Sequence, residues 1–144
     1  MNSEKNWKEA DKGIFLVNVL GIIFDPKTRK ILIGRREKDP FMPKLTWGFP
    51  GGRPEYGEEL EHYLKAEIKG KTGVEVESLG VIFAKTYPEK REFISIYYLC
   101  ELTGGKEKAQ GSFKEIKWVK PQDLEKHFTT SFHPKLKEYI LNLK

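Results

Sequence analysis

Residues 47–74 read W-G-F-P-G-G-R-P-E-Y-G-E-E-L-E-H-Y-L-K-A-E-I-K-G-K-T-G-V, and this stretch decides the fold. Its first part ends at Pro50-Gly51-Gly52, which is a strong turn signal. Its second part predicts a helix over residues 58–68, because glutamates crowd the first turn, where the helix dipole favours negative charge. Apolar residues recur there at the spacing of one helical face, at Leu60, Leu64 and Ile68. Tyr63 lies beside them.

Strand-like segments lie on both sides of this stretch. Upstream, the branched apolar run 14–24 and the segment 30–36 flank the turn signal Asp25-Pro26-Lys27-Thr28, which predicts a hairpin. Further elements follow as a short strand at 47–50, strands at 74–87, 92–101 and 115–119, and helices at 121–127 and 134–143. This order predicts one α/β domain over residues 1–144, with a mixed β-sheet between helices.

Residues 52–74 resemble the box of the Nudix hydrolases, a MutT-like family whose signature is G-x5-E-x7-R-E-U-x-E-E-x-G-U with U aliphatic. An alignment without gaps places six residues on box positions, namely Gly52, Glu58, Glu67, Ile68, Gly73 and Val74. The lead-in also matches at Trp47, Phe49, Pro50 and Gly51. The resemblance implies a Nudix-like α/β/α sandwich. It also implies hydrolysis of the pyrophosphate bond in a nucleoside diphosphate linked to another moiety, with Mg²⁺ or Mn²⁺ as the cofactor.

Three residues depart from the box, because Ala66 replaces its arginine, and Gly70 and Lys71 replace its last two glutamates. Positions 67, 70 and 71 are neighbours on one helical face. Three carboxylates there would carry a charge of about −3 and suit Mg²⁺, which prefers oxygen ligands. Here glutamate, glycine and lysine have a formal sum of zero. We therefore expect weakened metal binding and an activity that is weak, altered or lost.

The resemblance assigns candidate site residues. Glu67 and Glu58 are the candidate catalytic carboxylates, and Glu67 and the Gly51 carbonyl are the candidate metal ligands. The candidate substrate-binding residues are Arg35, Arg36, Phe49, Gly51, Gly52, Lys71 and Tyr87.

Simple physical chemistry supports some of these assignments and offers alternatives for others. Guanidinium groups make paired hydrogen bonds to phosphate, but strand alternation aims only one of Arg35 and Arg36 at the site. Phe49 and Tyr87 could stack on a base, although aromatic side chains more often pack in the core. Glu67 and Lys71 also have the spacing of a helix ion pair.

Composition excludes several classes of protein. The 26 Lys+Arg and 21 Asp+Glu give a net charge of +5, but lysines alternate with glutamates, which disfavours nucleic acid as a partner. The 12% of aromatic residues excludes a disordered chain, and the single Cys100 excludes an internal disulfide framework. The polar leader 1–12 has no secretory segment, and the run 14–24 is too short for a membrane helix. We expect a cytoplasmic protein with no membrane partner.

Three functions remain open at this point, and so does the question of whether the chain is an enzyme. The first is a Nudix-type hydrolase with a reduced site. The second is a catalytically inactive Nudix-like module that binds a nucleotide, with Lys71 serving as a cation against a phosphate. The third is a basic domain that binds nucleic acid or a protein. Nudix proteins are often dimers, so a homodimer is among the expected assemblies.

Overall fold

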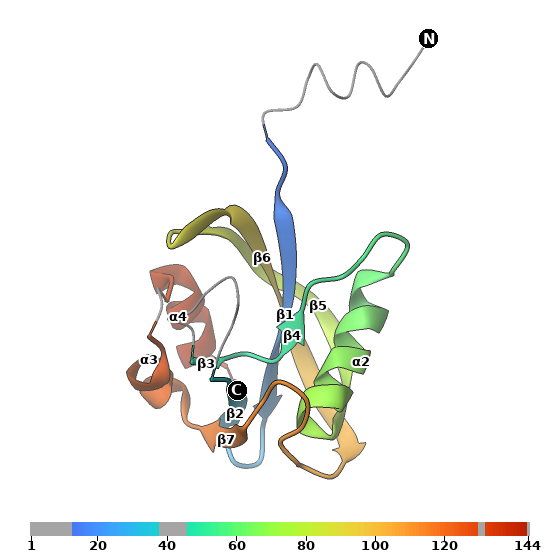
Figure 1. The fold of residues 1–144 in the computed structure, drawn as a ribbon. Helices are drawn as coiled ribbons and strands as arrows, with labels where there is room; N and C mark the ends of the chain where they lie inside the picture. Colours follow the sequence, from blue (N-terminus) through green and yellow to red (C-terminus); the bar gives the residue numbers. More distant parts are fainter. Residues whose placement is uncertain (1–12, 38–45, 130–131, 144) are drawn as a thin grey trace.

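The computed structural model describes residues 13–37, 46–129 and 132–143, and the predicted leader 1–12 lies outside them. The elements are β1 (Leu16–Asp25), β2 (Lys30–Arg35), β3 (Trp47–Gly48), β4 (Gly51–Gly52), α2 (Leu60–Thr72), β5 (Val74–Tyr87), β6 (Lys90–Gly105), β7 (Glu115–Val119), the 3-10 helix η1 (Pro121–Asp123), α3 (Leu124–His127) and α4 (Pro134–Leu141). In Figure 1, α2 lies on one side of the strands, and α3 and α4 lie on the other side. The predicted α/β sandwich is confirmed.

One mixed sheet connects these elements in the order β3-β2-β1-β6-β5, with β4 paired to β1 and β7 paired to β2. The central strands β1 and β6 run parallel, from Leu16 opposite Phe93 to Phe24 opposite Glu101. The other strand pairs are antiparallel, and they include the predicted hairpin between β1 and β2. None of the described helices is long and apolar enough to cross a membrane.

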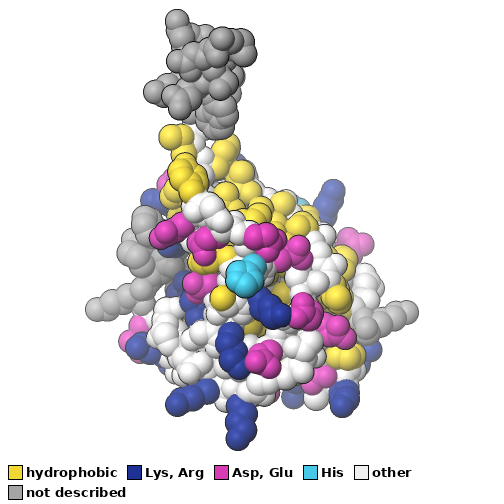
Figure 2. Space-filling view, turned by 90° about the vertical axis from the view of Figure 1, so that its right-hand side faces the viewer, with side chains coloured by type: hydrophobic (Ala, Val, Ile, Leu, Met, Phe, Trp, Pro, Cys, Tyr) yellow, Lys and Arg dark blue, Asp and Glu magenta, His cyan; other side chains and the backbone are white. Residues whose placement is uncertain are grey.

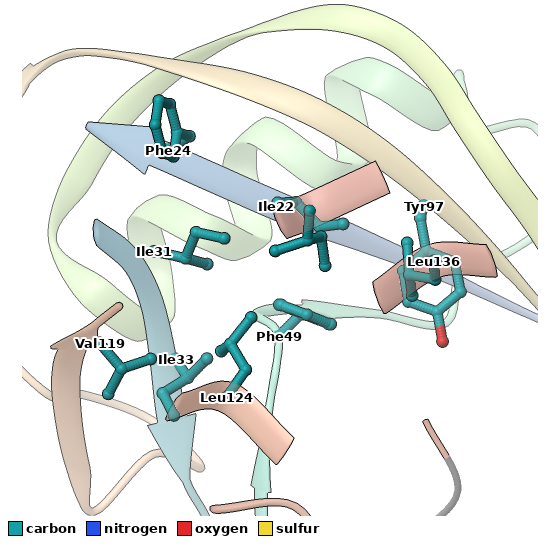
Figure 3. Close-up of a cluster of buried hydrophobic side chains, with 10 residues drawn as sticks. Ile22, Phe24, Ile31, Ile33, Phe49, Tyr97, Val119, Leu124 and Leu136 are labelled. Carbon is teal, nitrogen blue, oxygen red and sulfur yellow. The ribbon is translucent and has the colours of Figure 1, made fainter. Parts of the chain in front are cut away.

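Apolar side chains pack on both faces of the sheet, which explains why β1 reads as a nearly continuous apolar run. Ile22 faces α3 and α4, whereas Val19 and Ile23 face α2. Figure 3 shows the cluster on the first face, which includes Ile33 and Leu136. The central strand is therefore held in place from both sides.

Helix α2 differs from its predicted range of 58–68, because it begins at Leu60 and ends at Thr72. Glu59 is the N-cap, and its carboxylate accepts the N–H groups of residues 61 and 62 at 3.1 and 2.7 Å. At the other end, Gly73 adopts a left-handed φ of 77° and donates its N–H to the Lys69 carbonyl at 2.9 Å. Gly70 does not end the helix, although it costs about 1 kcal/mol relative to alanine.

Most other predicted elements match the structure to within two residues at each end, and two differ by more. Strand β6 continues to Gly105 because Gly104 and Gly105 still pair with the start of β5, whereas the predicted strand ends at residue 101. The predicted helix at 121–127 is a 3-10 turn followed by the single turn of α3.

Cys100 lies in β6 under α2, where 1% of its surface is exposed and burial raises the pKa of its thiol to about 12. A thiol with the ordinary value of 9.0 would hold about a thousandfold more thiolate at pH 8. We expect iodoacetamide to label Cys100 at least about 100-fold faster in urea than in the native protein, as measured by mass spectrometry. Equal rates would contradict this burial, and Cys100→Ser controls for other labelled groups.

Candidate active site

The side chain of Lys71 connects the end of α2 to the glycine turn. Its ammonium donates a hydrogen bond to the Gly51 carbonyl and lies 3.4 Å from Oε2 of Glu67. Only 16% of the Lys71 side chain is exposed, and 32% of that of Glu67. The predicted ion pair between Glu67 and Lys71 is confirmed, and we call Gly51, Glu67 and Lys71 the Lys71 site.

Gly51 and Gly52 let two parts of the site approach closely. Both residues pair with β1, opposite Leu20 and Val19 respectively. A Cβ on Gly51 would collide with the Val19 carbonyl oxygen, and a Cβ on Gly52 would collide with the Tyr63 hydroxyl. The glycines therefore fix the position of the Gly51 carbonyl. Their role in substrate binding stays a prediction.

Tyr63 contacts the Lys71 site. The sequence pattern predicts this residue only beside the apolar stripe of the helix. Its hydroxyl donates a hydrogen bond to Glu67 and accepts one from the backbone N–H of Arg53. Burial, and then the charges of Glu67 and Glu58, raise the pKa of Tyr63 to about 12. Tyr63 therefore stays protonated and holds the Glu67 carboxylate. The spacing of residues 63 and 67, one helical turn apart, is the signal that could have revealed the contact.

Phe113 forms one wall of the site and was not predicted. Its ring is 2% exposed, and it occupies the space that a side chain at Gly34 would fill. The Lys71 ammonium lies 6.0 Å from the ring centroid, and the Arg36 guanidinium carbon lies 5.3 Å from it. Both cations are within the range of a cation–π contact.

The two arginines at the end of β2 have different surroundings. Arg35 pairs with Glu115 in the sheet, and its Nε donates to Oε1 of that residue at 3.2 Å. Its Nη1 lies 3.8 Å from a carboxylate oxygen of Glu37. Arg36 instead stacks on Phe113 beside Lys71. The structure therefore brings Arg36, and not Arg35, to the Lys71 site.

The remaining candidates lie elsewhere or are not described. Phe49 is 4% exposed, and its ring centroid lies 6.0 Å from that of Tyr97 and 5.2 Å from that of Phe128. Phe49, which the sequence predicted as a substrate-binding residue, instead lies in the core, as Figure 3 shows. Glu58 accepts the N–H of Glu55 at 2.7 Å in the turn before α2. The structure does not describe the side chain of Tyr87.

The electrostatics of Lys71 reflect its surroundings. Burial lowers the pKa of its ammonium, the charge and hydrogen bond of Glu67 raise it, and the positive charges of Arg36 and Arg53 lower it. The two guanidinium groups therefore further lower the pKa of an ammonium whose pKa burial already lowers. This region gathers positive charge around one carboxylate.

The residues present do not fit a divalent metal ion at the Lys71 site. The two predicted ligand groups, the Gly51 carbonyl and the Glu67 carboxylate, already contact an ammonium, and Gly70 offers no side chain. A divalent ion about 4 Å from that ammonium would be repelled by about 8 kcal/mol at an effective dielectric constant of 20. Across residues 13–37, 46–129 and 132–143, no three His, Cys, Asp or Glu side chains gather into a group suited to a metal.

The fold and the glycine turn before α2 define a class of protein, and the comparisons identify it. The family model described as NUDIX domain matches residues 15–140, so the chain belongs to the Nudix family and is MutT-like. It is 36% identical over 113 residues to an ADP-ribose pyrophosphatase of Methanocaldococcus jannaschii, covering 76% of this chain and 64% of the relative. It is 31% identical over 90 residues to the nucleoside triphosphatase NudI of Escherichia coli, covering 54% and 64%.

Solved structures support the same fold. A NUDIX hydrolase from Nitrosomonas europaea has a TM-score of 0.72 at 19% identity, covering 90% of this chain and 72% of that one. The MutT protein from Methanosarcina mazei Go1 has a TM-score of 0.74 at 17% identity, covering 91% and 96%. At these identities the likeness shows the fold alone.

Proposed function

We propose that this chain is a Nudix-type hydrolase that slowly cleaves the pyrophosphate bond of a nucleoside diphosphate linked to another moiety. The observation that carries the proposal is the Glu67 carboxylate, which Tyr63 holds beside the glycine turn. The relative named ADP-ribose pyrophosphatase supports this substrate class.

We expect low turnover because the positive charge of Lys71 opposes the binding of a divalent metal ion. Nudix hydrolases generally use divalent metal ions, which supply several kcal/mol of transition-state stabilisation in metal-assisted hydrolysis. The Lys71 site does not fit such an ion. Each 1.4 kcal/mol corresponds to about a tenfold change in rate. We therefore expect turnover at least about 100-fold below that of relatives with a complete box.

Chromatography of the products of ADP-ribose, nucleotide sugars and dinucleoside polyphosphates tests this function, with Mg²⁺ or Mn²⁺ present. We expect slow formation of nucleoside monophosphate, and its loss in Glu67→Gln. The matched control is Glu61→Gln, which removes an exposed carboxylate from the same helix. Turnover that survives Glu67→Gln would contradict the role of this carboxylate.

A second candidate function is a nucleotide-binding module without turnover. The observation that favours it is the Lys71 ammonium, which contacts both predicted metal ligands, the Gly51 carbonyl and the Glu67 carboxylate. In that case ADP-ribose would raise the melting temperature, since a ligand of the native state stabilises it. Products would stay at the level of the buffer blank.

The structure gives less support to a basic nucleic-acid-binding domain. Figure 2 shows the face that carries α2, where Lys and Arg side chains intermix with Asp and Glu. On this helix, Lys65 is paired with Glu77, and Lys69 with Glu75. Nucleic-acid affinity depends on concentrated positive charge, which this face does not present.

A further inference from the structure

The Lys71 site already contains a cation between a carbonyl oxygen and a carboxylate oxygen, which are the ligand types that hard metal ions prefer. We infer that the Lys71 ammonium serves as the built-in cation of this site, so that Lys71, Arg36 and Arg53 bind a diphosphate group without a metal ion. This inference rests on the ligand class of the proposed function and adds the means of recognition.

Several contacts hold Lys71 in position. Its backbone carbonyl accepts the N–H of Gln110 at 3.0 Å, and the next carbonyl, of Thr72, accepts the N–H of Lys108 at 2.8 Å. The loop before β7 therefore fixes the end of α2. The Phe113 ring packs beside the Lys71 side chain, and Tyr63 holds Glu67, the ion-pair partner of Lys71. An ammonium held in this way loses little further freedom when an anion arrives.

The neighbouring charges suit a diphosphate. Arg36 and Lys71 both contact the Phe113 ring. Arg53 follows the glycine turn, where its guanidinium carbon lies 5.2 Å from the Phe93 ring centroid and its positive charge lowers the pKa of Lys71. These three cations and the Glu67 carboxylate have a formal charge of +2. The two phosphates that link a nucleoside diphosphate to another moiety carry about −2, and guanidinium groups bind phosphate through paired, charge-assisted hydrogen bonds.

Gly70 is consistent with the same arrangement. A Cβ at this position would meet no atom within 4 Å, so lack of space does not require a glycine there. Its φ does not require glycine either, because the residue lies within α2. A carboxylate at position 70 would, however, add negative charge beside Lys71. An uncharged residue at position 70 therefore preserves the positive charge of the site, and nothing in the structure explains why that residue is glycine rather than alanine.

Calorimetry with the non-hydrolysable α,β-methylene analogue of ADP-ribose tests the inference. We expect the analogue to bind in EDTA at least as tightly as in excess Mg²⁺. Lys71→Met should weaken binding at least about tenfold, and Arg36→Met should also weaken it. The matched control Lys65→Met removes the same charge from the same helix and should change the Kd less than about twofold, because exposed ion pairs contribute little. Thermal melts of each variant establish that it is folded.

The outcomes separate this inference from the proposed function. Binding that requires Mg²⁺, no binding in either buffer, or equal binding by folded Lys71→Met would overturn the inference, even if the wild type hydrolyses ADP-ribose. Binding in EDTA that depends on Lys71 supports it, even if no substrate is turned over. In that second case only the proposed hydrolase activity fails.

Discussion

The variant Ala66→Arg, Gly70→Glu, Lys71→Glu is expected to bind Mn²⁺ and to hydrolyse ADP-ribose at least about 100-fold faster than the wild type. The change removes the ammonium from the Gly51 carbonyl and places three carboxylates on one face of α2. The structure offers room for it, because positions 66 and 70 are exposed and a Cβ at Gly70 meets no atom within 4 Å. Calorimetry measures Mn²⁺ binding, and product chromatography measures the rate.

A charge-matched control makes this test specific. The triple variant changes the net charge by −2, and Lys65→Glu changes it by the same amount on the same helix, one to two turns from positions 70 and 71. We expect Lys65→Glu to keep the wild-type rate and to bind no Mn²⁺. An equal rate increase in both variants would show that general surface charge, and not the restored ligand set, is responsible.

The sequence predicted most of the architecture, because the patterns of apolar residues that indicate helices and strands are local properties. The apolar stripe of α2 and the nearly continuous apolar run of β1 need no knowledge of distant residues. The end of α2 was harder to predict, because Gly70 and Gly73 both look like terminators. Gly73 ends the helix because its left-handed φ and its close approach to the Lys106 carbonyl require a glycine. That approach depends on a loop more than thirty residues further along the chain.

The same limit applies to the site. The spacing of Glu67 and Lys71 predicted their ion pair, because both lie on one helix. The hydrogen bond from Lys71 to Gly51 joins residues 20 positions apart, and no local rule supplies it. Strand alternation predicted that one arginine faces the site, but the packing of Phe113 on β2 decides that it is Arg36. The sequence therefore predicted contacts between site residues on one helix. It did not predict the contacts that the tertiary fold adds.

Phe113→Ala is expected to lower the free energy of unfolding by about 3–5 kcal/mol, the usual cost of removing a buried phenyl ring. The ring packs directly over the backbone of Gly34, which has no side chain to move into the space. The cavity should therefore persist, which places the cost toward the upper end of this range. Urea unfolding followed by tryptophan fluorescence measures the change.

Two control variants identify the cause of this loss. Phe113→Leu should cost less, because leucine refills part of the space over Gly34. Phe15→Ala removes the same ring from a residue that is 51% exposed and should change stability by no more than about 0.5 kcal/mol. A loss below about 1 kcal/mol in Phe113→Ala would show that the loop does not seal this side of the sheet. Lys71 and Arg36 both contact the ring. In that case a group other than Phe113 would have to hold these two cations in position.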